Sequence, residues 1–178
     1  MNTELEQLVV IPLPGSDPEI GRALWAMQDT RRGTLEALQD LPAGALDALT
    51  PGTTNTIGTI LYHIALVEAS WLYEDTLQQP IPADLEPLFP VDSRDEEKLL
   101  SKMQGFDLDS YLQRLAVVRG RLLDVFRAMS IEDFRTIRHI TGQYDVTPEW
   151  ILHHLTQHED EHRGHIQMLV DGLKLQAT

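Results

Sequence analysis

The feature that most constrains this chain is a helical spacing of apolar residues, which recurs in four separate segments. In each segment an aliphatic side chain returns after three or four positions, which places these side chains on one face of an α-helix. The segments begin near Ser16, Thr56, Asp107 and Thr147. We find no convincing alternation of apolar and polar residues, as a strand would show, and no repeat of fixed period. The pattern therefore predicts an all-α fold, a four-helix bundle.

Capping and helix-breaking residues set the expected ends of these helices. The run Ser16–Glu19 combines a capping residue, an early proline and a glutamate, and it opens the first helix, which stops at Pro42. The other three helices are expected to end before Pro80, near Met129 and near Gly172.

The connection between the second and third helices is too long for a tight turn. It contains the proline-rich span Pro80–Pro90 and a short helix expected over Ser93–Met103. Such a length suits a long crossover connection between helices that are not antiparallel neighbours. A chain of 178 residues has the size of one domain, so we expect residues 1–178 to form a single bundle domain with an irregular segment over 1–15.

Charge and composition exclude several classes of function. The formal net charge is −14, so nucleic acids and anionic membranes would be repelled, and neither is expected as a partner. The chain has no cysteine, which removes disulfides and thiolate metal sites and favours a cytoplasmic location. No apolar stretch reaches the roughly 18 residues of a transmembrane helix. A metal ion, if bound, must use histidine or carboxylate ligands.

Histidines interrupt the apolar stripe of the fourth helix. The inward positions, spaced by three or four residues, are Ile151, Leu155, His158, His162, Ile166, Leu169 and Leu173. A step of four residues turns a helix by about 40° and climbs about 6 Å, so two imidazoles spaced in this way can reach one ion. His63 lies on an apolar face of the second helix, between Ile60 and Val67.

Three converging imidazoles are typical of a metal site. Neutral imidazole is the commonest metal ligand in proteins, and three of them leave an open fourth position on zinc for water or substrate. A single buried histidine more often has its ring nitrogen hydrogen-bonded to a backbone carbonyl than to a metal. Two histidines at i and i+4 in an aliphatic stripe lose apolar burial and need several buried hydrogen bonds, a cost that a bound metal would offset. His154 and His165 lie close enough in sequence to replace a ligand, although the rim of the site suits them better. His153 is a further histidine of this helix that could replace a ligand. His139 is expected in a surface loop.

Two other metal-site patterns overlap these residues. The run from His158 to His162 fits the H-E-x-x-H signature of zinc proteases, but Met168 stands where the extended pattern needs a third histidine. A di-iron bundle would need two E-x-x-H motifs, and only one is present. Glu159, Asp160 and Glu161 are therefore expected on a solvated or rim face, where Glu159 is a candidate for ordering a metal-bound water.

The residues around these histidines resemble the DinB-like family of metal-dependent four-helix bundles. The segment from Thr56 to Trp71, with His63 at its centre, is similar to the first family motif, and the segment from His158 to His165 is similar to the second. The resemblance spans nearly the whole chain. It implies a site made by His63, His158 and His162, which usually holds zinc or nickel, and it implies a homodimer.

The same resemblance includes transferases and an isomerase that act with low-molecular-weight thiols. Our leading hypothesis is a divalent-metal-dependent enzyme acting on a small-molecule substrate, either a thiol-dependent S-transferase or a hydrolase. A non-catalytic metal-binding or structural bundle is the alternative. Trp71 and Tyr144 are candidates for the walls of a pocket. The first and third helices are the candidate dimer faces, because the other two use their inner faces for the metal and the core.

Overall fold

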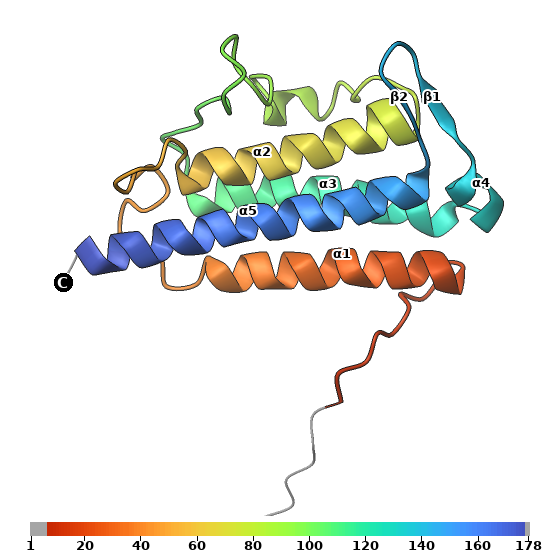
Figure 1. Ribbon diagram of the computed structural model, residues 1–178, viewed down its shortest axis with the longest axis horizontal. Coiled ribbons are helices and arrows are strands. Elements are labelled where there is room, and N and C mark those ends of the chain that lie inside the picture. The colour runs from red at the N-terminus through yellow and green to blue at the C-terminus, as the bar shows by residue number, and fades with distance from the viewer. Residues whose placement is uncertain (1–6, 177–178) are drawn as a thin grey trace, which may run out of the picture.

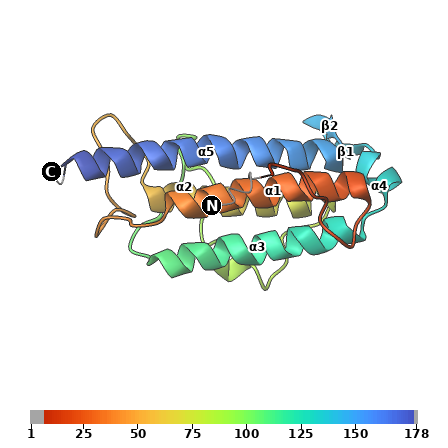
Figure 2. The same ribbon diagram turned by 90° about the horizontal axis from the view of Figure 1, so that it is seen from below.

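Four long helices form the body of the protein in the computed structural model, which describes residues 7–176 (Figure 1). They are α1 (Pro18–Ala37), α2 (Ile57–Ser70), α3 (Leu108–Ala128) and α5 (Pro148–Gln176). Helix α1 packs against α5 and α3, and α2 packs against α3 and α5. Figures 1 and 2 show that α2 and α3 run in the same direction, opposite to α1 and α5. The prediction of an all-α helical bundle is confirmed.

A long connection joins the two parallel helices α2 and α3. Helix α2 continues directly into a π-helical turn, Trp71–Thr76, and a short 3₁₀ helix follows at Glu86–Leu88. The chain then returns along the bundle to the start of α3, as Figure 1 shows in green.

The short helix expected over Ser93–Met103 is absent, and that prediction is wrong. The segment forms turns, with an isolated bridge between Arg94 and Leu100. The carboxylate of Asp95 accepts hydrogen bonds from the backbone N–H groups of Glu97 and Leu99. Such local bonds from an aspartate compete with helix formation, and the segment has too few apolar residues for packing to overcome them.

The link between α3 and α5 holds structure that the periodicity did not indicate. Helix α4 (Ile131–Arg135) is followed by an antiparallel hairpin of β1 (Arg138–Ile140) and β2 (Tyr144–Val146). The register pairs Arg138 with Val146, His139 with Asp145 and Ile140 with Tyr144. Strands of three residues are too short for an alternating pattern to be recognised in a sequence. The expectation of a chain without strands therefore needs correction here, and His139 lies on a strand rather than in a loop.

Three ends of the long helices differ from those expected. Helix α1 ends at Ala37 and not at Pro42, because Asp40 adopts a positive φ of 55°, which a continuing helix does not allow. Asp17, rather than Ser16, caps α1, because its carboxylate accepts a hydrogen bond from the Glu19 backbone N–H at 2.9 Å. Helix α5 continues past Gly172 to Gln176. A Cβ atom at Gly172 would lie 2.9 Å from Cγ2 of Thr50, so this glycine permits close packing instead of ending the helix.

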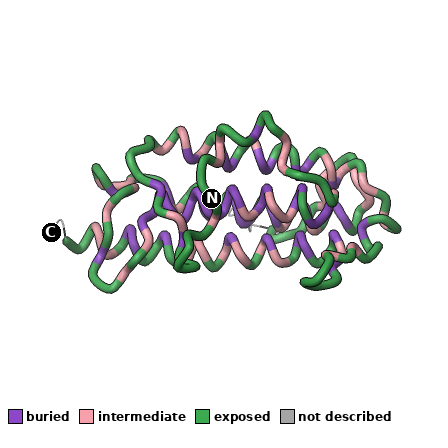
Figure 3. Tube along the Cα trace, turned by 90° about the horizontal axis from the view of Figure 1, so that it is seen from above, coloured by how far each residue is buried: buried purple, intermediate pink, exposed green. Residues whose placement is uncertain are grey.

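Apolar side chains fill the bundle in two clusters, one toward each end. One cluster includes Ile57, Leu61 and Ile166, and the other includes Leu24, Leu122 and Leu155. Figure 3 shows the buried positions recurring along each long helix. Residues 7–15 contain no helix or strand, as predicted, whereas the expectation for residues 1–6 lies outside the described residues. Between residues 7 and 176, no helix has the length and hydrophobicity needed to cross a membrane.

Candidate metal centre

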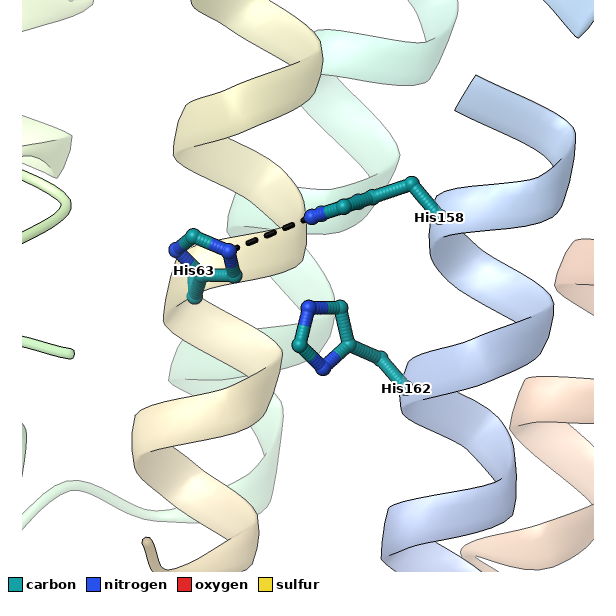
Figure 4. A group of neighbouring side chains, drawn as sticks. All are labelled: His63, His158 and His162. Atoms are coloured by element: carbon teal, nitrogen blue, oxygen red, sulfur yellow. Dashed lines mark hydrogen bonds between the residues drawn. The ribbon is translucent and has the colours of Figure 1, made fainter. Parts of the chain in front are cut away.

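The three histidines predicted as ligands meet between α2 and α5 (Figure 4). His158 and His162 lie one turn apart on α5, and His63 faces them from α2. The ring centroid of His63 is 5.1 Å from that of His158 and 5.0 Å from that of His162, and the latter two are 4.5 Å apart. Each residue offers one ring nitrogen to a group whose members all lie within 4.8 Å of one another. The structure thus brings the three together.

All three imidazoles are held in the neutral form. Burial, followed by the neighbouring His162 and Arg94, lowers the pKa of His63 to about 4, although a backbone hydrogen bond at Ser93 acts in the opposite direction. Burial, with His162 and His63 beside it, lowers the pKa of His158 to about 3. The pKa of His162 falls to about 4, first through burial and then through His165 and Arg94. Near neutral pH each ring therefore keeps a nitrogen lone pair that can bind a metal.

Hydrogen bonds within the protein do not account for the burial of these rings. The Nε2 atoms of His63 and His158 lie 3.1 Å apart, and the buried Nδ1 atom of His162 has no hydrogen-bond partner. Placing polar rings together without enough hydrogen-bond partners is costly, and metal coordination by the facing nitrogens would offset part of the cost of burying the rings. The donor set of three imidazoles fits a borderline divalent ion such as zinc or nickel.

Glu159 lies away from the histidines, in the centre of the bundle, where it is buried. Its carboxylate binds Arg31 of α1 at 2.6 Å and Arg119 of α3 at 2.7 Å. Glu68 of α2 binds the same two guanidinium groups, at 3.0 and 2.7 Å. Burial alone would raise the pKa of Glu159, but Arg31 and Arg119 outweigh it and keep that pKa below its ordinary value.

This four-helix charge network, formed by Arg31, Glu68, Arg119 and Glu159, corrects the expectation for Glu159. The residue follows His158 directly, and one residue turns a helix by about 100°, so the two side chains point in different directions. Glu159 is not on a solvated rim, and its carboxylate is already occupied by two arginines instead of being free to order a metal-bound water. Glu161 is exposed, as expected.

The other histidines surround the site or lie apart from it. His154 packs its ring 4.9 Å from those of Trp71 and Trp150 and 6.1 Å from that of His158. His165 is exposed, with its ring 5.5 Å from that of His162. His153 is exposed on another face of α5. His139 is exposed on the hairpin, where its Nδ1 lies 2.8 Å from Asp145.

A cavity of about 540 Å³ lies at the hairpin end of the bundle. Trp71 and Tyr144, both predicted as pocket walls, line it together with Trp150, Ile137 and Val146. Both aromatic residues therefore lie where pocket walls were predicted. The π-helical turn begins at Trp71 and so forms one wall of the cavity.

Two kinds of functional residue were missed by the sequence analysis. Arg94, on the connection between α2 and α3, lies near enough for its charge to lower the pKa values of His63 and His162. No sequence pattern points to it, because the turn that places it is irregular. Arg31 and Arg119 were detectable in principle, since each stands four residues after a buried apolar residue, Met27 or Leu115, and so falls within an apolar stripe.

Fold and site together define a helical bundle with a three-histidine group, compatible with a metal ion, between its second and fourth long helices. Residues 26–166 match the DinB superfamily, and the chain belongs to that superfamily. The match includes His63, His158 and His162. A comparison with curated proteins gave no match.

Proposed function

We propose that this protein is a divalent-metal-dependent enzyme whose ion is held by His63, His158 and His162. The observation that carries the proposal is the convergence of three neutral imidazoles, each with one ring nitrogen within 4.8 Å of the other two. Zinc and nickel are the ions that best suit this donor set. Membership in a superfamily whose fold carries such sites supports the same conclusion.

A catalytic role is favoured over a structural one by the number of ligands. Structural zinc sites are closed by four protein ligands, whereas catalytic sites keep a position open. Among residues 7–176, no Asp, Glu or further His places a ligand atom within 4.8 Å of all three histidine nitrogens. A non-catalytic, structural bundle remains the competing hypothesis, and a fourth ligand from the protein would support it.

The open position defines the reaction class that we propose. A divalent ion held by the three histidines would supply Lewis acidity, lowering the pKa of a water or thiol at its open position and making it a nucleophile near neutral pH. Thiol-dependent S-transfer and hydrolysis both use such a nucleophile, with a low-molecular-weight thiol as cosubstrate in the first case. The positive charge of Arg94 beside the histidines would favour an anion forming at this place.

Elemental analysis of protein purified without a metal-affinity tag tests the site. We expect roughly one zinc, nickel or similar ion per chain. His158→Ala and His162→Ala should each lose most of it, because one imidazole of three is removed. His139→Ala and His154→Ala are the matched controls, since neither ring belongs to the group. Equal metal loss in all four variants, or a metal-free wild type, would contradict the proposal.

Cobalt substitution tests whether the fourth position is open. The visible absorption of the Co²⁺-loaded protein should change when 2-mercaptoethanol is added, and a thiolate-to-metal absorption band should appear. The His158→Ala variant serves as the control for cobalt bound elsewhere. A spectrum that does not respond to thiol while the ion stays bound would favour the structural hypothesis.

A further inference from the structure

We propose that the cavity at the hairpin end binds a flat, uncharged apolar group of the substrate whose reacting end reaches the three histidines. This inference rests on the proposed function and extends it to the class of substrate. The volume of about 540 Å³ falls within the roughly 300–1,000 Å³ of known small-molecule sites.

Aromatic rings make the cavity suitable for a flat group. Trp71 is stacked against Tyr144 with ring centroids 5.7 Å apart, and it is tilted against Trp150 at 5.6 Å. The Tyr144 hydroxyl donates a hydrogen bond to Asp75 at 2.9 Å, which fixes the orientation of the tyrosine ring. Trp150 is nevertheless 47% exposed, although large aromatic side chains are usually covered. A ligand with an aromatic ring would cover it.

The charges near the cavity disfavour an anionic occupant. Asp145 is among the lining residues, and Asp75 lies behind Tyr144. In the described part of the chain no lysine or arginine lines this cavity. A carboxylate or phosphate placed there would meet like charge without a cation to pair with it, which disfavours its binding.

His154 connects the cavity to the candidate metal centre. Its ring contacts Trp71 and Trp150 on the cavity side and lies 6.1 Å from His158 on the other side. One imidazole thus separates the wall of the cavity from a candidate ligand. The rings of Trp150, His154 and His158 thus follow one another along α5, and we infer that the reacting end of the substrate extends along this row from the cavity toward the histidine group.

Calorimetric titration with two probes of the same shape tests the occupant. We expect 2-naphthalenemethanol, which is uncharged, to bind the zinc-loaded protein, and 2-naphthoate, its anionic counterpart, to bind at least tenfold more weakly. Trp150→Ala should weaken the binding of 2-naphthalenemethanol by about 3- to 10-fold, which is the effect of losing one aromatic contact between protein and ligand. Met168→Ala, which removes another exposed apolar side chain of the same helix, is the matched control and should leave the affinity unchanged.

Paramagnetic broadening tests the connection to the histidines. The proton signals of bound 2-naphthalenemethanol should broaden when one equivalent of Cu²⁺ replaces Zn²⁺, and the zinc protein is the diamagnetic control. Equal binding of the two probes, equal affinity in Trp150→Ala and wild type, or binding without broadening by bound copper would each overturn the inference. A chain that binds the probe but holds no metal would instead overturn the proposed function, so the two failures are distinguishable.

Discussion

Each histidine of the candidate site is more easily protonated in the unfolded chain than in the folded one. The folded pKa values of about 4 for His63, 3 for His158 and 4 for His162 lie below the ordinary value of 6.5. Above pH 6.5 the rings are neutral in both states. Below pH 6.5 these histidines become protonated in the unfolded chain but stay neutral in the folded chain. The free energy of unfolding therefore decreases as the pH falls from about 6.5 toward 4.

We therefore expect the metal-free protein to show a steep fall in its free energy of unfolding over this pH window. Urea unfolding at several pH values measures it. His158→Gln removes one of the titrating rings and should flatten the fall, whereas His139→Gln, which changes an exposed histidine, should not. Identical pH dependence in wild type and His158→Gln would show that the buried rings do not cause the loss.

Glu159 illustrates how a buried charge depends on its partners. Replacing one member of a buried ion pair leaves an uncompensated charge, which typically costs about 3–5 kcal/mol. We expect Glu159→Gln to destabilise the protein by about this amount, measured by urea unfolding, because Arg31 and Arg119 then share only Glu68.

The exposed residue Glu161 on the next part of the same helix gives the control for this change. Glu161→Gln should alter the unfolding free energy by less than about 0.5 kcal/mol. The folded Glu159→Gln protein should retain its metal, since the carboxylate does not touch the histidines. Loss of metal from the folded Glu159→Gln protein would indicate that this carboxylate contributes to metal binding.

At the scale of elements, the approach of α3 to α2 depends on a glycine. A Cβ atom at Gly58 would lie 2.5 Å from the Tyr111 hydroxyl oxygen, which donates a hydrogen bond to the Met103 carbonyl. The start of α2 can pack closely on α3 only because this side chain is absent.

Gly58→Ala should accordingly destabilise the protein by about 1–3 kcal/mol, the usual cost of overpacking a core. Gly120→Ala on α3 is the matched control, since nothing lies within 4 Å of a Cβ there, and it should be neutral or stabilising by up to about 1 kcal/mol. Thermal unfolding of both variants, alone and with Tyr111→Phe, measures the effect. Equal stability of the two alanine variants would contradict this description of the helix contact.

The same elements show what the sequence could and could not predict. Long helices were predictable because many apolar positions repeat, and His63, His158 and His162 stood out because they occupy such positions. The hairpin was missed because three residues per strand carry too little pattern. Residues 93–103 were assigned wrongly because the local bonds of Asp95 decide that segment. The partners of Glu159 depend on how four helices face one another, which no single helix pattern contains.

At the scale of the whole molecule, we propose that two chains form a homodimer, since two-fold dimers are the commonest oligomers of soluble proteins. Helices α1 and α3 remain the proposed faces, and Leu35 is the exposed large apolar residue of α1. With a net charge of −14 on each chain, the contact must be largely apolar.

Static light scattering at low and high salt tests the dimer. Salt screens the repulsion between the two acidic chains, so the dimer should persist or tighten as salt is added. Leu35→Asp should weaken it, and Leu99→Asp, at an exposed residue of the connection outside both helices, is the control. A monomeric mass at both salt concentrations would contradict the proposed dimer.

The four-helix charge network also limits how the sequence can change over evolutionary time. The charges of two arginines and two glutamates cancel between the two apolar clusters, and each long helix contributes one of these four residues. An apolar core position tolerates another side chain of similar volume, one residue at a time. A member of the network has less freedom, because a single replacement by a neutral residue leaves an uncompensated charge in the interior. Loss of charge at these four positions is therefore expected to proceed through paired substitutions on different helices.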